Sequence, residues 1–336
     1  MDQQIDVVTG GAGFIGSHLV DKLLSQGRSV RVIDSLVTGH PRNLQQHQDN
    51  PNLEFIQGDI TNTVLMNQAC QQAERVFHVA ARADIVPSIE DPTEYFKSNV
   101  EGTLSVLEAA RLHRVKRLVY IASSSCYGFP DVFPTPETAK ISPQYPYALT
   151  KYLGEEMVLH WHKVYKMPVA SVRCFNVYGP RARTSGSYGA VFGVFLAQLL
   201  AGKPLTIVGD GQQVRDFVYV SDVVEAIIAA ANSSVSGEVF NIGSGQKPVS
   251  VNRLVELLGA KETTHIPKRP GEPDMTWADV TKIQSILKWQ AKVSIEEGVK
   301  IMLDNMHYWQ TAPVWTPESI ADATKVWFKY LESPSV

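Results

Sequence analysis

The stretch I-D-V-V-T-G-G-A-G-F-I-G, from Ile5 to Gly16, decides the fold of this chain. It predicts a short apolar strand that runs into Gly10, Gly13 and Gly16, followed by an amphipathic helix over Phe14–Ser25. Glycines at these positions allow a sharp turn and let a pyrophosphate approach bare N–H groups at the helix N-terminus. We therefore expect a dinucleotide site at the first strand-to-helix turn.

A second predicted strand, Ser29–Ile33, ends at Asp34, about 20 residues after the glycines. A carboxylate at that distance is placed to accept hydrogen bonds from the 2′- and 3′-hydroxyls of an adenosine ribose. It would repel a 2′-phosphate, so the sequence favours NAD over NADP. The alternative is a tight strand-to-helix turn that binds no ligand, and the presence of Asp34 disfavours it.

Length and composition exclude several classes of protein. The 336 residues suffice for one two-lobed unit or two domains. A net charge of −3 gives no electrostatic reason to expect nucleic acid or a membrane as partner. The polar start, Met1–Asp6, does not fit a signal peptide, and the longest apolar stretch, Ala190–Gly202, is too short to span a bilayer. Three cysteines without C-x-x-C spacing indicate a reducing compartment, the cytoplasm, and the histidines lack zinc-ligand spacing, so we expect no metal.

Strands and helices alternate through the first half of the chain. Further strands are predicted at Leu53–Gln57, Arg75–Val79, Arg117–Ser123 and Val169–Arg173, and helices at Thr61–Ala69, Thr93–His113 and Tyr147–Tyr165. This alternation predicts an α/β fold, a doubly wound parallel sheet with right-handed crossovers.

The pattern loosens from about Pro180. A helix is predicted at Tyr188–Ala201, strands at Leu205–Val208, Arg215–Val220 and Glu238–Ile242, and one more helix at Thr316–Leu331, with Thr316 as its cap and Pro317 first in the helix. We expect a dinucleotide-binding domain over residues 1–180, with parts of 215–245 returning to it, and a smaller interleaved lobe over 181–336.

A second chemical motif is Tyr147-Ala-Leu-Thr-Lys151. A tyrosine and a lysine four residues apart share one helix face, and no other tyrosine here has a lysine four residues later. A free phenol has a pKa of about 10, which a neighbouring ammonium and a positive nicotinamide ring would lower. Tyr147 would then take a proton from a sugar hydroxyl while hydride leaves the same carbon. The alternative, an ordinary surface contact, is disfavoured by the serines Ser123–Ser125, which end the preceding strand where such folds place active sites.

With these motifs the chain resembles the extended short-chain dehydrogenase/reductases, and among them the nucleotide-sugar 4-epimerases. The resemblance covers Ile5 to Ile301. It is carried by T-G-G-A-G-F-I-G (Thr9–Gly16), Asp34, G-D-I (Gly58–Ile60), H-V-A-A (His78–Ala81), N-V-E-G-T (Asn99–Thr103), S-S-S-C-Y-G (Ser123–Gly128), Y-A-L-T-K (Tyr147–Lys151), F-N-V-Y-G-P (Phe175–Pro180), G-D-G-Q-Q-V-R-D-F (Gly209–Phe217) and R-P-G-E (Arg269–Glu272). It implies a Rossmann domain that binds NAD beside a lobe that binds a nucleotide sugar.

The resemblance also implies a role for each matching residue. The cofactor would be held by Gly10, Gly13, Phe14, Ile15, Gly16, Asp34, Asp59, Ile60, Ala80, Ala81, Asn99, Tyr147 and Lys151. The catalytic residues would be Ser123, Tyr147 and Lys151, with Tyr147 as the base. The UDP-sugar would contact Asp84, Ser124, Ser125, Asn176, Arg215, Arg269, Glu272 and Thr276.

One position separates the reactions of these relatives. The 4,6-dehydratases and uronate decarboxylases carry a glutamate two residues after the catalytic Ser or Thr, where this chain has Ser125. The resemblance therefore implies epimerisation, in which hydride leaves C4 and returns to the other face of a 4-keto sugar. Two alternatives stay open. A net-redox reductase or synthase is disfavoured by Asp34 if it uses NADP, and a non-catalytic NAD-binding member is disfavoured by the presence of Ser123, Tyr147 and Lys151.

The choice of sugar depends on a few side chains. Galactose-type epimerases carry a tyrosine where this chain has Thr276, so UDP-N-acetylglucosamine/galactosamine or its uronate becomes a candidate beside UDP-glucose/galactose. Asp84 would disfavour a uronate, and Val86–Ile89 lacks the arginine of the P-R-S-I motif of N-acetylhexosamine epimerases. The resemblance further implies a homodimer that buries the helices at Thr93–His113 and Tyr147–Tyr165.

Overall fold

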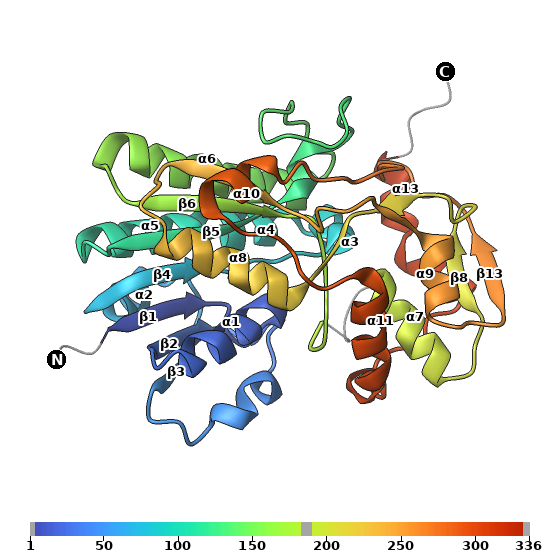
Figure 1. Ribbon diagram of the computed structural model, residues 1–336, viewed down its shortest axis with the longest axis horizontal. Coiled ribbons are helices and arrows are strands. Elements are labelled where there is room, and N and C mark those ends of the chain that lie inside the picture. Colours follow the sequence, from blue (N-terminus) through green and yellow to red (C-terminus); the bar gives the residue numbers. More distant parts are fainter. Residues whose placement is uncertain (1–3, 183–189, 332–336) are drawn as a thin grey trace.

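The computed structural model describes residues 4–182 and 190–331. At its centre is a parallel seven-stranded sheet with the order β11-β6-β5-β4-β1-β2-β3 (Figure 1). Because the order reverses beside β1, the carboxyl ends of β1 and β4 flank the point at which doubly wound folds bind their ligands. The predicted doubly wound parallel sheet is confirmed.

The strands of this sheet are short and mostly buried. They are β1 (Ile5–Thr9), β2 (Ser29–Asp34), β3 (Leu53–Gln57), β4 (Ala73–His78), β5 (Arg117–Ser123), β6 (Val169–Cys174) and β11 (Glu238–Ile242). The central strand β5 is buried over all but its last residue, as expected for a sheet covered on both faces, whereas the edge strand β3 is partly exposed.

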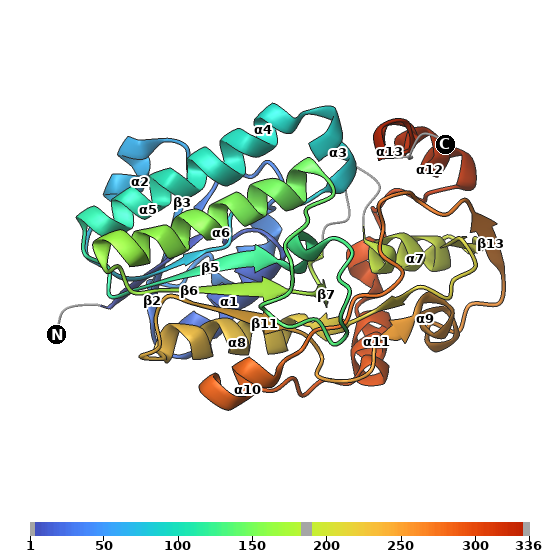
Figure 2. The same ribbon diagram turned by 90° about the horizontal axis from the view of Figure 1, so that it is seen from above.

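Helices cover both faces of the sheet. Figure 2 shows α2 (Thr63–Ala69), α5 (Gly102–Leu112) and α6 (Pro146–Tyr165) together on one side of the sheet and α8 (Val220–Asn232) on the other. Helix α1 (Phe14–Ser25) packs against α8. The sequence pattern does not predict this helix over Val220–Asn232, which begins at the last residue of the predicted strand Arg215–Val220.

The predicted helix Thr93–His113 is present but is not one regular α-helix. A π-helical turn, Lys97–Glu101, joins α4 (Pro92–Phe96) to α5. From this wider turn the Asn99 side chain reaches the backbone of Arg82, whose N–H donates to Asn99 Oδ1 at 2.8 Å and whose carbonyl accepts from Nδ2 at 3.0 Å. The irregular turn thus carries the residue that fixes the loop after β4.

A smaller lobe lies beside the carboxyl ends of the sheet strands (Figures 1 and 2). It includes α7 (Val191–Leu200), β8 (Leu205–Val208), α9 (Val251–Leu257), β13 (Thr263–Ile266) and α11 (Ile295–Asp304). β8 and β13 pair in parallel, and Phe195, Leu254 and Trp309 are buried in the lobe's core. The predicted helix Tyr188–Ala201 corresponds to α7, and its first two residues lie outside the described ranges.

The predicted strand Arg215–Val220 is divided at Asp216. Residues before it form β9 (Val214–Arg215), which pairs with β12 (Val249–Ser250), and residues after it form β10 (Phe217–Tyr219), which pairs with β7 (Asn176–Tyr178). The division arises because the buried Asp216 carboxylate accepts the backbone N–H groups of Ser244 at 2.8 Å and Ala278 at 2.9 Å. α8 then begins directly after β10.

The predicted C-terminal helix is also divided, into α12 (Pro317–Ala323) and α13 (Lys325–Leu331). Thr316 caps α12 as predicted, because its Oγ1 accepts the Ser319 N–H at 3.2 Å. Thr324 ends α12 with a 2.7 Å hydrogen bond from its hydroxyl to the Ile320 carbonyl. Over the described part of the chain, no helix has the length and apolar character needed to cross a membrane.

Candidate active site

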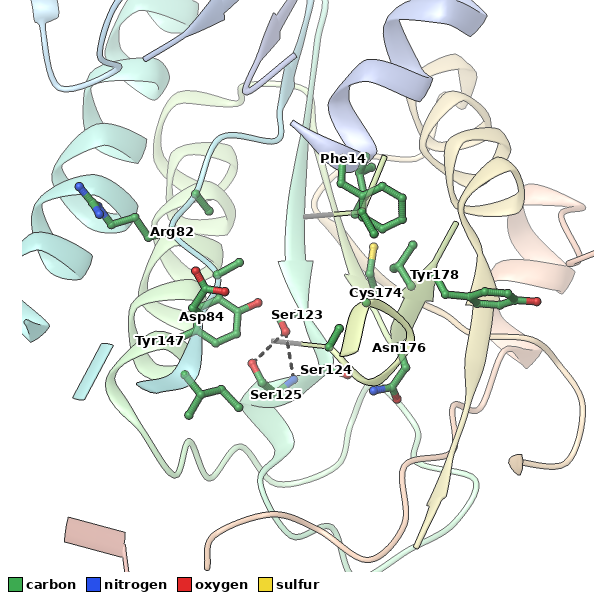
Figure 3. A pocket seen from close by; sticks show the side chains of 18 of the residues that line it. Phe14, Arg82, Asp84, Ser123, Ser124, Ser125, Tyr147, Cys174, Asn176 and Tyr178 are labelled. Carbon is green, nitrogen blue, oxygen red and sulfur yellow. Dashed lines mark hydrogen bonds between the residues drawn. The ribbon is translucent and has the colours of Figure 1, made fainter. Parts of the chain in front are cut away.

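A cavity of about 670 Å³ lies between the sheet and the smaller lobe. It extends from the glycine turn after β1, past the ends of β4, β5 and β6, to the loop Arg269–Glu272. Figure 3 shows the middle of this cavity, where side chains from β5, α6 and β7 face one another. The size and the mixture of apolar walls with a few polar groups are typical of a small-molecule site.

The glycine turn opens one end of α1 to the cavity. Gly10 has φ +71°, and a Cβ there would lie 2.7 Å from Ala80 Cα, so only glycine fits. Gly13 is the N-cap of α1 and has no side-chain cap, and a Cβ built there would have Gly10 O, at 3.2 Å, as its one described neighbour within 4 Å. Phe14, Ile15 and Gly16 line the cavity beside it. The free N–H groups of the first turn therefore face a space that suits a pyrophosphate.

Asp34 presents a rigid carboxylate at the end of β2. One of its oxygens accepts the Ala12 N–H at 2.9 Å and the other accepts the Leu36 N–H at 2.8 Å. Burial raises the pKa of Asp34, and these two hydrogen bonds oppose that rise. A Cβ at Gly39 would lie 2.7 Å from Oδ1, so the following loop can approach only because this residue is glycine. A fixed acceptor of this kind suits the hydroxyls of a ribose.

Two of the residues predicted to hold the cofactor lie behind the wall of the cavity. Asp59, Ile60, Ala80 and Ala81 line it as the prediction requires, but Asn99 and Lys151 do not. Asn99 is buried and, besides its bonds to Arg82, donates from Nδ2 to Thr150 Oγ1 at 3.0 Å. Its contact with the cavity is therefore indirect, through the loop after β4.

His78, like Asn99, lies behind the wall of the cavity and does not line it. Its two ring nitrogens lie 2.8 Å from Thr9 Oγ1 and 2.9 Å from Thr103 Oγ1. Thr103 in turn donates to the Asn99 carbonyl at 2.6 Å. Burial lowers the pKa of His78 to about 3, with Lys151 adding to the effect, so the ring is neutral. The network ties β1, β4 and α5 together behind the cofactor end of the cavity.

Tyr147 and Ser123 face each other across the cavity (Figure 3). Ser123 ends β5, and Tyr147 lies in the first turn of α6. Burial raises the pKa of Tyr147 to about 12, a hydrogen bond with Ser123 opposes this, and Cys174 and Asp84 raise the pKa further. The groups of the chain itself therefore keep the phenol protonated, and the pKa of Tyr147 is raised, not lowered as the sequence predicts.

Lys151 lies one turn further along α6 and is buried. Its Nζ is 4.3 Å from the centroid of the Tyr120 ring, whose hydroxyl donates to the Lys151 carbonyl at 3.1 Å. Burial lowers the pKa of Lys151 to about 7, and Cys174 and Glu155 oppose this. A group that exchanges a proton near neutral pH thus lies one helical turn from Tyr147 in α6.

The three serines at the end of β5, Ser123–Ser125, form a small hydrogen-bonded turn. Ser123 Oγ lies 2.8 Å from Ser125 Oγ and accepts the Ser125 N–H at 3.2 Å (Figure 3). Ser123 also caps the short 3₁₀-helix Ser124–Tyr127. All three serines line the cavity, so the predicted substrate contacts Ser124 and Ser125 lie beside Ser123.

The far end of the cavity carries two arginines and one glutamate. Arg215 Nη2 lies 3.1 Å from Glu272 Oε1, and Arg269 Nη1 lies 3.7 Å from Glu272 Oε2. All three line the cavity. Two guanidinium groups share one carboxylate, so this end has an excess positive charge that suits a diphosphate.

The predicted sugar contacts Asn176, Thr276 and Asp84 also line the cavity. Thr276 Oγ1 donates to Asn176 Oδ1 at 2.7 Å and accepts the Asp216 N–H at 3.1 Å. Asp84 precedes α3 (Ile85–Glu90), and Figure 3 shows it next to Tyr147. A carboxylate therefore lies close to the phenol, although the serine turn itself holds none.

Several lining residues are not among the site residues that the sequence predicts. They include Tyr145, Cys174, Phe192, Met275, Trp315 and Trp327. The ring of Tyr145 is nearly parallel to that of Tyr147, with 10° between the planes and 6.3 Å between the centroids. The aromatic residues of the C-terminal segment are conspicuous in the sequence, but no motif near them in the sequence connects them to a cavity.

Within the described ranges, no group of three or more His, Cys, Asp or Glu side chains is arranged to hold a metal ion.

Comparison with known proteins connects this geometry to a family. The sequence model of the NAD dependent epimerase/dehydratase family matches residues 7–243. The UDP-glucose 4-epimerase of Mycolicibacterium smegmatis is 36% identical over 299 residues, which cover 87% of this chain and 95% of the relative.

Solved structures give the same result. The UDP-glucose 4-epimerase of Thermotoga maritima, solved with UDP-glucose, has a TM-score of 0.85 and 37% identity, covering 90% of this chain and 99% of that chain. The UDP-glucuronic acid 4-epimerase of Bacillus cereus, solved with UDP-glucuronic acid and NAD, has a TM-score of 0.84 and 34% identity, with the same coverage. The expected relationship to nucleotide-sugar epimerases is confirmed.

Proposed function

Because the chain belongs to the NAD dependent epimerase/dehydratase family, we propose that it catalyses the 4-epimerisation of a UDP-sugar with NAD as its cofactor. The observation that carries this proposal is the pair formed by Tyr147 and Ser123, which face each other in the cavity. Ser125 supports it, because a hydroxyl takes the place of the acid that dehydratases and decarboxylases use.

NAD fits the residues present. The uncapped first turn of α1 suits its pyrophosphate, and Asp34 suits the adenosine ribose. When bound, NAD would accept hydride from C4 of the sugar and return it, and its positive nicotinamide ring would favour the phenolate of Tyr147. The cofactor would occupy the domain of residues 1–180 and the sugar nucleotide mainly the lobe of residues 181–336.

Residues of the chain would carry out proton transfer and substrate binding. Tyr147 takes the proton from O4 of the sugar, while Ser123 holds O4 by a hydrogen bond. Lys151, one helical turn from Tyr147, stabilises the phenolate when it is charged, which its pKa of about 7 allows at neutral pH. Arg215 and Arg269 hold the diphosphate, so that the sugar is free to present either face of its C4 to the cofactor.

We propose a sugar that is neutral at C6. Asp84 lies next to Tyr147, where its charge would repel a uronate carboxylate. The small side chain of Thr276 supports acceptance of a 2-acetamido group, so both UDP-N-acetylglucosamine and UDP-glucose, with their 4-epimers, are candidate substrates.

The test is a proton NMR time course of purified protein, without added NAD, with UDP-glucose, UDP-N-acetylglucosamine and UDP-glucuronate. We expect the 4-epimer of at least one neutral sugar to approach a fixed ratio, and no product with Tyr147→Phe. Tyr165→Phe, at the exposed end of the same helix, is the matched control and keeps activity. Turnover that requires stoichiometric NAD or NADP would favour a net-redox enzyme, and a 4-keto-6-deoxy product would favour a dehydratase that uses Asp84.

We further propose a homodimer in a reducing compartment, the cytoplasm. Apolar side chains on the outer side of α4, α5 and α6 are exposed, namely Phe96, Leu104, Leu112, Leu149 and Val164. Such an apolar face on three neighbouring helices suits a second copy of the chain. All three cysteines are buried free thiols, which supports the reducing compartment. Light scattering tests the dimer, and Leu104→Glu should give monomers.

A further inference from the structure

The C-terminal helix α13 reaches the substrate end of the cavity. It lies beyond Ile5–Ile301, where the family motifs occur, and beyond residues 7–243, which the family model matches. Trp327 nevertheless lines the cavity together with Arg269, Gly271 and Glu272. A segment outside the recognised motifs therefore forms part of the wall near the proposed diphosphate site.

Trp327 is held firmly against the loop that carries Arg269. Its indole N–H donates to the Pro270 carbonyl at 2.6 Å, and the side chain is almost completely buried. The guanidinium carbon of Arg269 lies 5.4 Å from the centroid of the Trp327 ring, within the range of a cation–π interaction. Gly271 has φ +72°, and a Cβ there would lie 3.3 Å from Leu331 at the end of α13. The helix thus packs directly on the Arg269–Glu272 loop.

The helix is itself fixed from two sides. Before it, Ile320 of α12 is buried in the core of the smaller lobe, and the Trp315 carbonyl accepts a 2.8 Å hydrogen bond from Gln198. On its other side α13 packs against α3, which follows Asp84 and belongs to the sheet domain (Figures 1 and 2). α13 therefore connects the two sides of the cavity at its substrate end.

We infer that Trp327 is a positioning residue for nucleoside-diphosphate binding, which acts by holding Arg269 in the cavity. An arginine on a loop has many rotamers, and binding a diphosphate would otherwise require ordering this side chain. The indole ring packs against the guanidinium, and Glu272 forms ion pairs with both Arg269 and Arg215. The inference rests on the proposed function, because it takes the ligand to be a UDP-sugar.

The experiment compares UDP binding, KM and kcat in wild type, Trp327→Ala, Trp327→Phe and Tyr330→Ala. Tyr330 lies on the same helix and is exposed, so it is the matched control. We expect Trp327→Ala to weaken UDP binding and raise KM about tenfold, because a cation–π contact is lost. We expect kcat to change less than about twofold, since the change removes binding and not chemistry. Trp327→Phe keeps an aromatic face and should recover part of the affinity, and Tyr330→Ala should match wild type.

Several results would overturn the inference. One is a Trp327→Ala protein that binds UDP like wild type. Another is a joint loss of UDP affinity, bound NAD and thermal stability that Trp327→Phe does not relieve, since this would show a purely structural role. If wild type binds UDP and epimerises the sugar but Trp327→Ala changes nothing, only this inference fails. If wild type binds no UDP, the proposed function fails with it.

Discussion

The hydroxyl of Ser123 lies 2.8 Å from the hydroxyl of Ser125. The resemblance to the family implies a glutamate at the second of these positions in dehydratases and decarboxylases. Here Ser125 instead makes a hydrogen bond to the residue proposed to hold O4 of the sugar, and its backbone N–H donates to the same oxygen. Ser125 would therefore orient the Ser123 hydroxyl and would not act as an acid.

The first prediction separates these two serines. Ser123→Ala should lower kcat about 100-fold, because a hydrogen bond to the reacting oxygen is lost. Ser125→Ala should lower kcat about tenfold or less, since its hydroxyl acts on the reacting oxygen through Ser123. Steady-state kinetics with an NMR or coupled readout checks both values, and bound NAD measured by absorbance is the control. Equal losses in the two variants would contradict the assignment.

The second prediction concerns Asp84, which lies beside Tyr147. Asp84→Ser removes a negative charge near the sugar, so the ratio of kcat/KM for UDP-glucuronate to that for UDP-glucose should rise at least about tenfold. Competition between the two substrates in one NMR tube measures this ratio directly. Asp91→Ser, on an exposed part of the adjacent turn, is the matched control. An unchanged ratio would show that Asp84 does not discriminate between UDP-glucuronate and UDP-glucose.

The third prediction tests the space around Thr276. Its hydroxyl donates to Asn176 Oδ1 at 2.7 Å, so both side chains are fixed in the wall of the cavity. Thr276→Tyr should lower kcat/KM for UDP-N-acetylglucosamine at least about tenfold and affect UDP-glucose less, since the acetamido group needs the space. Thr276→Ser, which keeps the hydroxyl, should retain both activities. A parallel loss of both substrates in the tyrosine variant would mean that the position does not select at C2.

The fourth prediction is a pH dependence of stability that comes from His78. Burial lowers its folded-state pKa to about 3 from the ordinary 6.5. Below pH 6.5 the unfolded chain takes up a proton that the folded protein does not, so stability should fall as the pH drops from 6.5 to about 3. Between pH 7 and pH 4.5, this group should account for about 1–3 kcal/mol.

Urea unfolding of wild type and His78→Asn at both pH values measures this contribution. The variant is expected to be less stable at pH 7, because hydrogen bonds to Thr9 and Thr103 change, but its loss on acidification should be smaller than that of wild type. An equal loss in both proteins would show that His78 does not control the acid sensitivity.

Local pattern was sufficient for much of the fold and for most of the cavity. The predicted bounds of α1, β3, β5, β8 and β11 match those observed, because α1 has helical periodicity and each strand is a short, mainly apolar run. The residues predicted to bind cofactor or substrate, from Gly10 to Thr276, line one cavity, apart from Asn99 and Lys151. Asn99 lies in the π-helical turn, whose wider geometry directs its side chain away from the cavity. The Lys151 side chain instead packs against the ring of Tyr120.

Features that depend on tertiary contacts could not be predicted. The division of Arg215–Val220 requires the distant N–H groups of Ser244 and Ala278, which bind the Asp216 carboxylate. The approach of Trp327 to Arg269 requires both the break at Thr324 and the packing of α13 on α3. The residue pattern within Arg215–Val220 or within the C-terminal helix does not indicate which distant residues will contact it.

The most direct test of the central claim follows the hydrogen on C4. A UDP-sugar with deuterium at C4, UDP-glucose or UDP-N-acetylglucosamine, is incubated with the purified protein in ordinary water without added NAD. Removal and return of hydride at the same carbon predicts a 4-epimer that keeps its deuterium at C4. Loss of the deuterium to solvent, its appearance at C6, or its release on a reduced nicotinamide would contradict 4-epimerisation.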